Sequence, residues 1–264
     1  RHTIPVVMGT GLMMSAGYLA YHDTKMRQAY RERHAQTQHD HTGAEFSFVK
    51  DPCRNQQYEH VANCYDDSIG RDEFFMGINW LRQVLLKYHA RGTVLEVGAG
   101  TARNLKFYPG SVQRVLLTDA SESMLNQAKK KVANLSTLER KRFGFVLGDS
   151  QRLSSLPSNA FDTVVDTFGL CSYDDPVAVL NEMARVCQKQ SGKILLLEHG
   201  RSKTWSWITQ HLDRHVEQHA ANWGCVWNRD LDHILESSNV QVEILSTYHF
   251  GTTYYVVCRP KHNA

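Results

Sequence analysis

The stretch VLEVGAGTARN at residues 94–104 constrains the fold more than any other part of this chain. Its first four residues are an apolar run that predicts a short buried strand. Gly98 and Gly100, one residue apart, then predict a tight turn where a ligand approaches the backbone with no Cβ in its way. A helical pattern begins at Asn104. Strand, glycine turn and helix in this order are typical of a nucleotide-binding α/β fold.

The residues around the two glycines narrow the choice of ligand. A dinucleotide site needs a third glycine, so that a pyrophosphate can lie at the helix N-terminus. Arg103 occupies that position here, and the NAD fingerprint is therefore excluded. Glu96 lies two residues before the first glycine, where a carboxylate suits a cationic nucleoside without phosphate. The stretch thus favours S-adenosylmethionine.

Apolar runs alternate with helical patterns along the following 100 or so residues, as in chains that form parallel sheets. An amphipathic helix at residues 72–89 is predicted to cover the first strand. The sequence therefore predicts a parallel, doubly wound sheet. Its further strands are expected at 115–118, 143–147, 161–167 and 193–197, with helices at 123–135 and 176–186.

The last apolar runs, at residues 240–248 and 252–259, are separated by a turn that is too short for a crossover helix. Such neighbours must pair antiparallel. A parallel sheet that ends in an antiparallel hairpin is typical of class I methyltransferases and not of dehydrogenases. We therefore predict a Rossmann-like, seven-stranded α/β sheet with an antiparallel last strand.

Acidic side chains stand where three of the predicted strands end. Glu96, Asp119 and Asp149 follow strands in chain order, and the loop at 168–175 follows the next strand. In open parallel sheets, ligands bind outside the carboxyl ends of the strands. A carboxylate at Asp119 suits both hydroxyls of a ribose, and Asp149 suits an adenine amino group, with Ser150 or Gln151 adding a backbone contact. The alternative role for each is a helix cap.

Composition excludes several other classes. A net charge of +3 argues against nucleic-acid binding by electrostatics. No C-x-x-C occurs, so a zinc knuckle is not expected, and we interpret the thiols as mostly reduced. Three histidines at helical spacing, His211, His215 and His219, suit a zinc site less well than a surface or interfacial stripe. The six cysteines are Cys53, Cys64, Cys171, Cys187, Cys225 and Cys258.

The N-terminal part differs from the rest of the chain in the distribution of its charged residues. Residues 4–21 carry no charge and, as a helix, would be about 27 Å long, close to the thickness of a bilayer core. We predict a transmembrane anchor at 1–22, a polar linker at 23–57 and a catalytic domain at 58–264. A signal-peptide core, a buried helix and a retained targeting sequence are the alternatives. The basic residues after the span predict a domain on the cytosolic or matrix side.

Several segments of the chain together resemble one family. The chain is similar to the fungal Oms-type, methyltransferase-like proteins of the mitochondrial inner membrane, which are related to membrane-anchored thiol methyltransferases and ubiquinone C-methyltransferases. The similarity covers about residues 58–260, and it implies an S-adenosylmethionine cofactor and a matrix-side domain. The segments are VLEVGAGTARNLKFYP, DTFGLCSYDDPVAVLNEMARV, ILLLEHGRS, NWGCVWNRDLDHIL and HFGTTYYVV.

The predicted cofactor site joins the glycine turn to the acidic strand ends. Many methyltransferases have a third glycine where this chain has Ala102, a departure that bears on cofactor affinity. No Asn-Pro-Pro-Tyr follows the fourth strand, which disfavours methylation of amide or exocyclic amino nitrogens. The predicted cofactor-binding residues are Tyr65, Glu96, Gly98, Gly100, Thr101, Asn104, Asp119, Ala120, Asp149 and Ser150, and no metal site is predicted.

Methyl transfer from a sulfonium needs mainly orientation, and a base only if the acceptor is protonated. His199, after the fifth strand, is the predicted base, ahead of Cys171, Tyr173 and Asp174 in the loop after the fourth strand. The aromatic residues at 223–228 would either wall an apolar pocket or pack a helix onto the sheet.

The sequence predicts a methyltransferase in the mitochondrial inner membrane that acts on a small lipophilic or thiol acceptor. The alternative is an accessory or assembly subunit of a mitochondrial membrane complex with little or no activity. Methylation of ribosomal RNA or protein is a third hypothesis, which the low net charge weakens.

Overall fold

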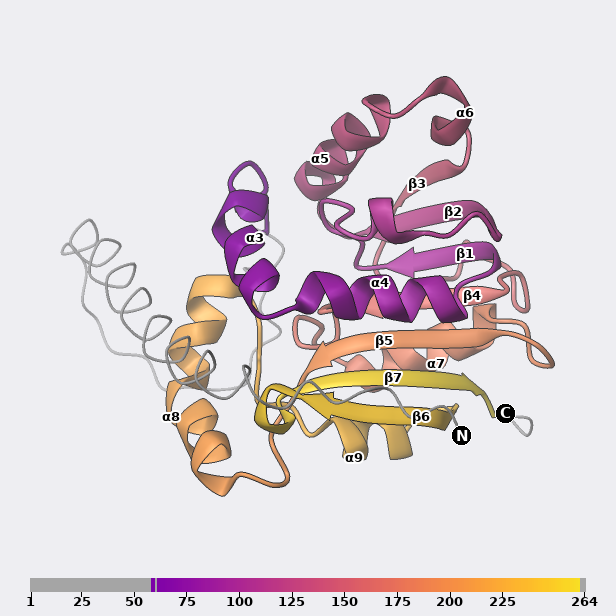
Figure 1. Cartoon of the computed structure of the whole chain (residues 1–264). Helices are drawn as coiled ribbons and strands as arrows, with labels where there is room; N and C mark the ends of the chain where they lie inside the picture. Colours follow the sequence, from indigo (N-terminus) through magenta and orange to yellow (C-terminus); the bar gives the residue numbers. More distant parts are fainter. Residues whose placement is uncertain (1–57, 60, 262–264) are drawn as a thin grey trace.

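The computed structural model describes residues 58–261 except residue 60 (Figure 1). The predicted anchor at 1–22 and linker at 23–57 lie outside the described residues. Within the described part, no helix is both long enough and apolar enough to cross a membrane. The single-span topology therefore stays a prediction.

One seven-stranded sheet with the order β3-β2-β1-β4-β5-β7-β6 organises the chain. The first five strands pair in parallel, whereas β7 runs antiparallel to both β5 and β6. This arrangement confirms the predicted sheet and its antiparallel end. The strands are β1 (Gly92–Val97), β2 (Val112–Asp119), β3 (Phe143–Leu147), β4 (Thr163–Thr167), β5 (Lys193–His199), β6 (Val240–Tyr248) and β7 (Thr253–Pro260).

Helices cover both faces of this sheet (Figure 1). On one face, α4 (Ile78–His89) and α5 (Glu122–Ala133) pack against alternate residues of the strands, such as Val94 and Val115. On the other face, α7 (Pro176–Val186) and α9 (Leu231–Glu236) pack against the residues in between, such as Leu95. Because the inner strands are buried on both faces, they are continuous apolar runs.

The predicted helix at 72–89 is wrong in one respect, because it consists of two helices. α3 (Tyr65–Phe75) ends before Gly77, whose φ of 69° lies in the left-handed region, and α4 starts at the next residue. Glycine adopts this conformation without the strain that a Cβ would cause. The break turns α3 away from α4, so that the first turn of α3 reaches the carboxyl edge of the sheet.

The helix predicted after the glycine turn is only a single 3-10 turn, η1 (Leu105–Phe107). Tyr108, which precedes a proline, has an extended backbone with φ −66° and ψ 121°. A proline disfavours the helical conformation of the residue before it, and the helix therefore ends there.

The remaining elements connect the layers. The hairpin turn between β6 and β7 is η2 (His249–Gly251), as expected from its length. Capping side chains start α5 and α7, since Ser121 accepts from the Met124 N–H and Asp175 accepts from the Ala178 N–H. The long α8 (Ser206–Trp223) is the helix that the histidine spacing after the fifth strand indicated, whereas α6 (Thr137–Arg140) and α9 were not foreseen individually. The five cysteines in the described residues are free thiols.

Candidate functional site

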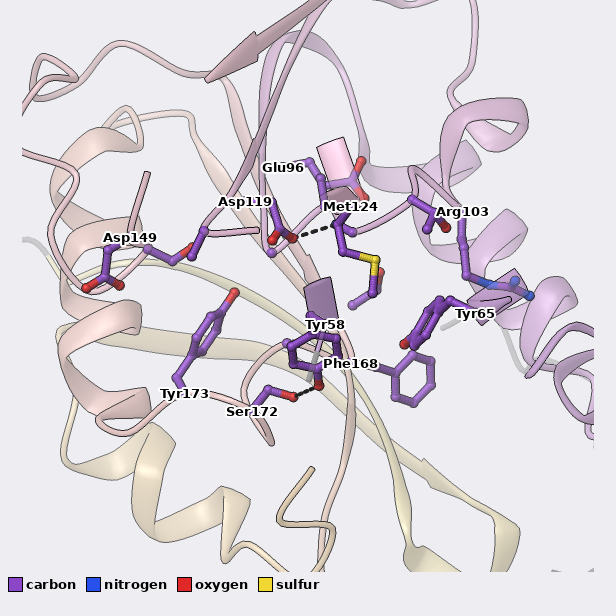
Figure 2. Close-up of a pocket in the computed structure, with 18 of the residues that line it drawn as sticks. Tyr58, Tyr65, Glu96, Arg103, Asp119, Met124, Asp149, Phe168, Ser172 and Tyr173 are labelled. Atoms are coloured by element: carbon purple, nitrogen blue, oxygen red, sulfur yellow. Dashed lines mark hydrogen bonds between the residues drawn. The ribbon is translucent and has the colours of Figure 1, made fainter. Parts of the chain in front are cut away.

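A cavity of about 440 Å³ lies at the carboxyl ends of β1, β2 and β4. The three acidic strand ends meet there, as parallel-sheet geometry predicts. Figure 2 shows Asp149 at one end of the cavity, Arg103 and Tyr65 at the other, and Asp119 between them. The predicted cofactor-binding residues that line it are Tyr65, Glu96, Gly98, Gly100, Thr101, Asp119, Ala120, Asp149 and Ser150.

Two backbone amides fix the Asp119 carboxylate at the end of β2. The Gly100 N–H donates to Oδ2 at 2.7 Å, and the Ser121 N–H donates to Oδ1 at 2.8 Å. Burial raises the pKa of this carboxyl, although the amide bonds act in the opposite direction. Each carboxylate oxygen accepts about two hydrogen bonds, so one acceptor position per oxygen remains for a pair of ligand hydroxyls.

Glu96 lines the cavity but is itself only 2% exposed. Its oxygens accept from the Asn104 amide at 2.9 Å and from the Tyr108 hydroxyl at 2.5 Å. Burial raises the pKa of Glu96 to about 7, even though both hydrogen bonds favour the charged form. Asn104 is the one predicted cofactor-binding residue that lies outside the lining. It positions Glu96 from behind the cavity wall.

Sequence reasoning missed Arg82, a buried cation at the end of the cavity opposite Asp149. Its guanidinium donates to the Asn104 side-chain oxygen at 3.0 Å, to the Thr167 hydroxyl at 2.6 Å and to Glu73 at 2.8 Å. The signal was present in the spacing, since Arg82 follows Ile78 by four residues and therefore lies on the apolar face of its helix.

Arg103, the residue that breaks the NAD fingerprint, strengthens the cationic end. It lines the cavity and pairs with Glu73 at 2.7 Å and with Asp66 at 2.9 Å. α3 therefore closes over this end through ion pairs from Asp66 in its first turn and Glu73 in its last turn. Arg82 and Arg103 together provide donors of the kind that bind a carboxylate.

The cavity is also lined by four aromatic side chains, those of Tyr58, Tyr65, Phe168 and Tyr173 (Figure 2). The Tyr58 hydroxyl hydrogen-bonds the Ser172 hydroxyl at 2.7 Å and the Trp223 carbonyl at 3.0 Å, so the chain before α3 is fixed across the opening. Phe168 adopts a left-handed φ of 61°. Backbone strain of this kind in a non-glycine residue is characteristic of functional sites.

His199, the predicted base, ends β5 but lies outside the cavity lining. Its ring packs against that of Phe168 with a centroid separation of 4.5 Å, and Phe168 is the ring that faces the cavity. The described geometry gives His199 no direct place in the cavity, and its role as base stays a prediction. Tyr173 and Asp174 from the same group of candidates do line the cavity, whereas Cys171 is buried beneath it.

The residues of the two other sequence patterns do not line the cavity. Trp227 stacks on His219 at 3.8 Å and donates to the Leu212 carbonyl at 3.0 Å, so this tryptophan packs against α8. In the histidine stripe, the His215 ring nitrogen hydrogen-bonds the His211 carbonyl of its own helix at 2.9 Å. Among residues 58, 59 and 61–261, no cluster of three metal-ligating side chains is found.

Ala102 has a left-handed φ of 59°, a conformation that glycine adopts without strain. Its side chain is 2% exposed and packs into the core on the α4 face, not into the cavity. We therefore expect Ala102→Gly to leave the Kd for S-adenosylhomocysteine within about twofold of the wild-type value in calorimetry. A large gain in affinity would contradict this placement of the methyl group.

The polar side chains that line the cavity fit S-adenosylmethionine along the whole length of the cavity. The fixed carboxylate of Asp119 suits a ribose, and Asp149 lies at the end where an adenine would be bound. The guanidinium groups at the far end suit an amino-acid carboxylate. In addition, a Cβ on Gly98 would lie 2.3 Å from the Tyr173 hydroxyl, so the floor of the cavity has no room for a side chain there.

Comparisons with known proteins agree with this geometry. A family described as "Methyltransferase domain" matches residues 95–196. The chain is 34% identical to the mitochondrial methyltransferase OMS1 of Saccharomyces cerevisiae over 77% of this chain and 45% of that protein. It is 30% identical to the human thiol S-methyltransferase TMT1B over 57% of this chain and 62% of that protein. The chain thus spans less than two thirds of these relatives.

Solved structures show the same fold at low sequence identity. A structure described as a DhpI–SAH complex has a TM-score of 0.58 and 17% identity, over 80% of this chain and 96% of that one. The [4+2]-cyclase SpnF has a TM-score of 0.60 and 15% identity, over 78% of this chain and 94% of that one. At these identities the likeness supports the fold alone.

Proposed function

Since the chain carries a methyltransferase domain of the S-adenosylmethionine-dependent class I type, we propose that it methylates a small lipophilic or thiol acceptor at the mitochondrial inner membrane. The observation that carries the proposal is the cavity in which Asp119, Asp149 and the Arg82–Arg103 pair stand in the order that the cofactor requires. The relatives whose names include a thiol acceptor support the acceptor class.

The bound cofactor supplies a methyl group that its cationic sulfur activates for displacement. The protein contributes binding and orientation, which can account for about 7–11 kcal/mol of the barrier in a well-aligned transfer. When the cofactor binds, Asp119 would hold its ribose, and Arg82 and Arg103 would hold its carboxylate. α3 covers the cationic end through its ion pairs. The rings of Tyr58, Tyr65 and Phe168 exclude water and offer an apolar surface to the acceptor.

The cellular setting is part of the same proposal. The name of the yeast relative includes a mitochondrial location, and the uncharged stretch at residues 4–21 supports a single membrane span. The basic residues after this stretch favour a domain on the matrix side. Membership in an inner-membrane complex remains the second hypothesis. Ala102, as a departure from the usual glycine that bears on cofactor affinity, would favour this hypothesis, but the residue does not line the cavity.

A label-transfer experiment with the full chain tests the activity. Methyl-labelled S-adenosylmethionine is offered with an alkyl thiol, a quinol or phosphatidylethanolamine vesicles, and we expect label on the thiol or the quinol. Asp119→Ala should reduce transfer at limiting cofactor at least tenfold, since two hydrogen bonds to a charged acceptor, each worth about 1.5–3 kcal/mol, are lost. Asp213→Ala, in an exposed ion pair, is the matched control and should transfer normally. Full activity of Asp119→Ala would contradict the assigned site.

A further inference from the structure

Two buried carboxyl groups lie side by side beneath the cavity. Asp166 near the end of β4 and Glu198 near the end of β5 are both 0% exposed. Their strands are neighbours, with Asp166 opposite Leu196, so Asp166 and Glu198 point to the same face of the sheet. Glu198 accepts from the backbone N–H of Gly169 at 3.3 Å and from that of Leu170 at 3.2 Å.

The Asp166 carboxyl and the Tyr173 hydroxyl are unusual because, within the described residues, neither makes a hydrogen bond of normal geometry. Glu198 and the Gly169 amide make weaker contacts with the Asp166 carboxyl, and Ser150 makes one with the Tyr173 hydroxyl. Buried polar atoms are nearly always paired, and leaving one unpaired costs about 1–3 kcal/mol. Such atoms at the edge of a cavity are therefore candidates for contacts with a ligand.

Asp166 Oδ1 and the Tyr173 hydroxyl converge on one point in the cavity floor. A Cβ on Gly169 would lie 2.2 Å from Asp166 Oδ1 and 2.7 Å from the Tyr173 hydroxyl oxygen. A Cβ on Gly98, on the opposite side, would lie 2.3 Å from the same hydroxyl and 3.8 Å from Asp166 Oδ1. Figure 2 shows the Tyr173 ring reaching from the loop after β4 towards the middle of the cavity. The hydroxyl thus links the cavity to the buried carboxyl pair.

The surroundings favour the protonated form of both carboxyls. Burial raises the pKa of Asp166 and of Glu198 well above the usual range, and the charge of Asp166 raises that of Glu198 further. Two adjacent carboxyls that cannot both ionise share a proton. The other titratable or charged groups that act on the pair, on Tyr173 or on the adjacent thiols are Glu96, Asp119, Cys171, Cys225 and Arg229.

We propose that the Asp166–Glu198 pair, reached through the Tyr173 hydroxyl, accepts the proton that the methyl acceptor loses. The acceptor is then a neutral molecule with a dissociable proton, such as a thiol, and the inference rests on the proposed methyltransferase function. In the step, the bond between the acceptor's nucleophilic atom and its hydrogen breaks, while an electron pair of that atom forms the bond to the methyl carbon. The electrons of the broken carbon–sulfur bond remain on sulfur, and the proton passes through Tyr173 to the carboxyl pair.

A calorimetric comparison of two ligands tests this assignment without an acceptor. S-adenosylmethionine differs from S-adenosylhomocysteine by one methyl group and one positive charge on sulfur. A positive charge within about 4–6 Å favours the ionised form of a carboxyl. Titrations in two buffers of different ionisation enthalpy should therefore show proton release with S-adenosylmethionine and little with S-adenosylhomocysteine. The difference should vanish in Asp166→Asn and in Glu198→Gln, and persist in the exposed control Asp213→Asn.

Thermal unfolding provides a second test of whether the carboxyl pair holds a proton, and it needs no ligand. A carboxyl whose folded pKa is raised binds a proton in the folded state that the unfolded chain has released above about pH 4. Its contribution to stability therefore falls as the pH rises towards the folded pKa. The Tm of Asp166→Asn should therefore rise relative to that of the wild type as the pH increases above about 4, where the unfolded carboxyl ionises.

The possible results separate the two claims. Equal proton release with both ligands, or release that persists in Asp166→Asn, would overturn the proton-acceptor assignment while leaving the methyltransferase proposal intact. If neither ligand binds, the proposed function fails, and the thermal series alone decides whether the pair holds a proton. Parallel Tm curves for the wild type and Asp166→Asn would then show that it does not.

Discussion

Gly98→Ala should weaken the binding of S-adenosylhomocysteine at least tenfold, equivalent to about 1.4 kcal/mol or more. Gly98 has a φ of 55°, and a Cβ there would lie 2.3 Å from the Tyr173 hydroxyl oxygen. The methyl group would force Tyr173 out of its place and into the space that the cofactor must occupy. Calorimetric titration of the purified full chain measures the loss.

The matched control is Gly77→Ala. Gly77 has a similar φ of 69°, but no atom lies within 4 Å of its hypothetical Cβ within the described part of the chain. Both substitutions carry the strain of a left-handed residue, about 1–2 kcal/mol. Only Gly98→Ala should also lose affinity. If Gly77→Ala binds as weakly as Gly98→Ala, general destabilisation and not the cavity floor explains the effect.

Arg82→Met should have the largest effect on stability, a loss of about 3–5 kcal/mol. Arg82 is 3% exposed, and its charge, with that of Arg103, holds the pKa of Glu73 below the usual range although burial acts to raise it. Without the guanidinium, Glu73 keeps only Arg103, and the Asn104 oxygen loses a donor. Urea denaturation of both proteins gives the difference in the free energy of unfolding.

Lys193→Met tests whether burial is the reason for that loss. Lys193 pairs with Glu243, but the two side chains are 28% and 31% exposed. An exposed ion pair contributes at most about 1 kcal/mol. A similar cost for both substitutions would mean that the Arg82 network is not the buried support that its hydrogen bonds indicate.

The strand ends could be predicted because parallel sheets place them at one edge whatever the details of packing. The alternation of strands and helices was therefore enough to predict the positions of Glu96, Asp119 and Asp149, and all three line the cavity. The antiparallel hairpin at residues 240–259 could be predicted equally well, since the length of its turn allows no other pairing.

Other features depend on contacts that a linear pattern does not contain. A lone glycine inside a helical pattern is often tolerated, so Gly77 gave no clear signal for the break between α3 and α4. The Asp166–Glu198 pair requires β4 and β5 to be neighbours, which the order of strands in the sheet decides. A charged residue within the apolar run at 163–167 was nevertheless a visible sign of function.

His199 illustrates the same limit at the site itself. Its position after a strand predicted the correct edge of the sheet, but the side chain packs against Phe168, and Phe168 lines the cavity in its place. The orientation of the Phe168 ring follows from the left-handed backbone of this residue, which no neighbouring residue type predicts. Strain of this kind is set by the surrounding packing and cannot be inferred from spacing.

We propose above all that the cavity at the ends of β1, β2 and β4 is a cofactor site. Calorimetric titration of the wild-type full chain with S-adenosylhomocysteine tests this claim most directly. We expect one binding site per chain, with a Kd between about 1 µM and 1 mM, the range in which the KM values of most enzymes lie. Absence of binding at millimolar ligand, in a chain whose cooperative unfolding shows that it is folded, would contradict it.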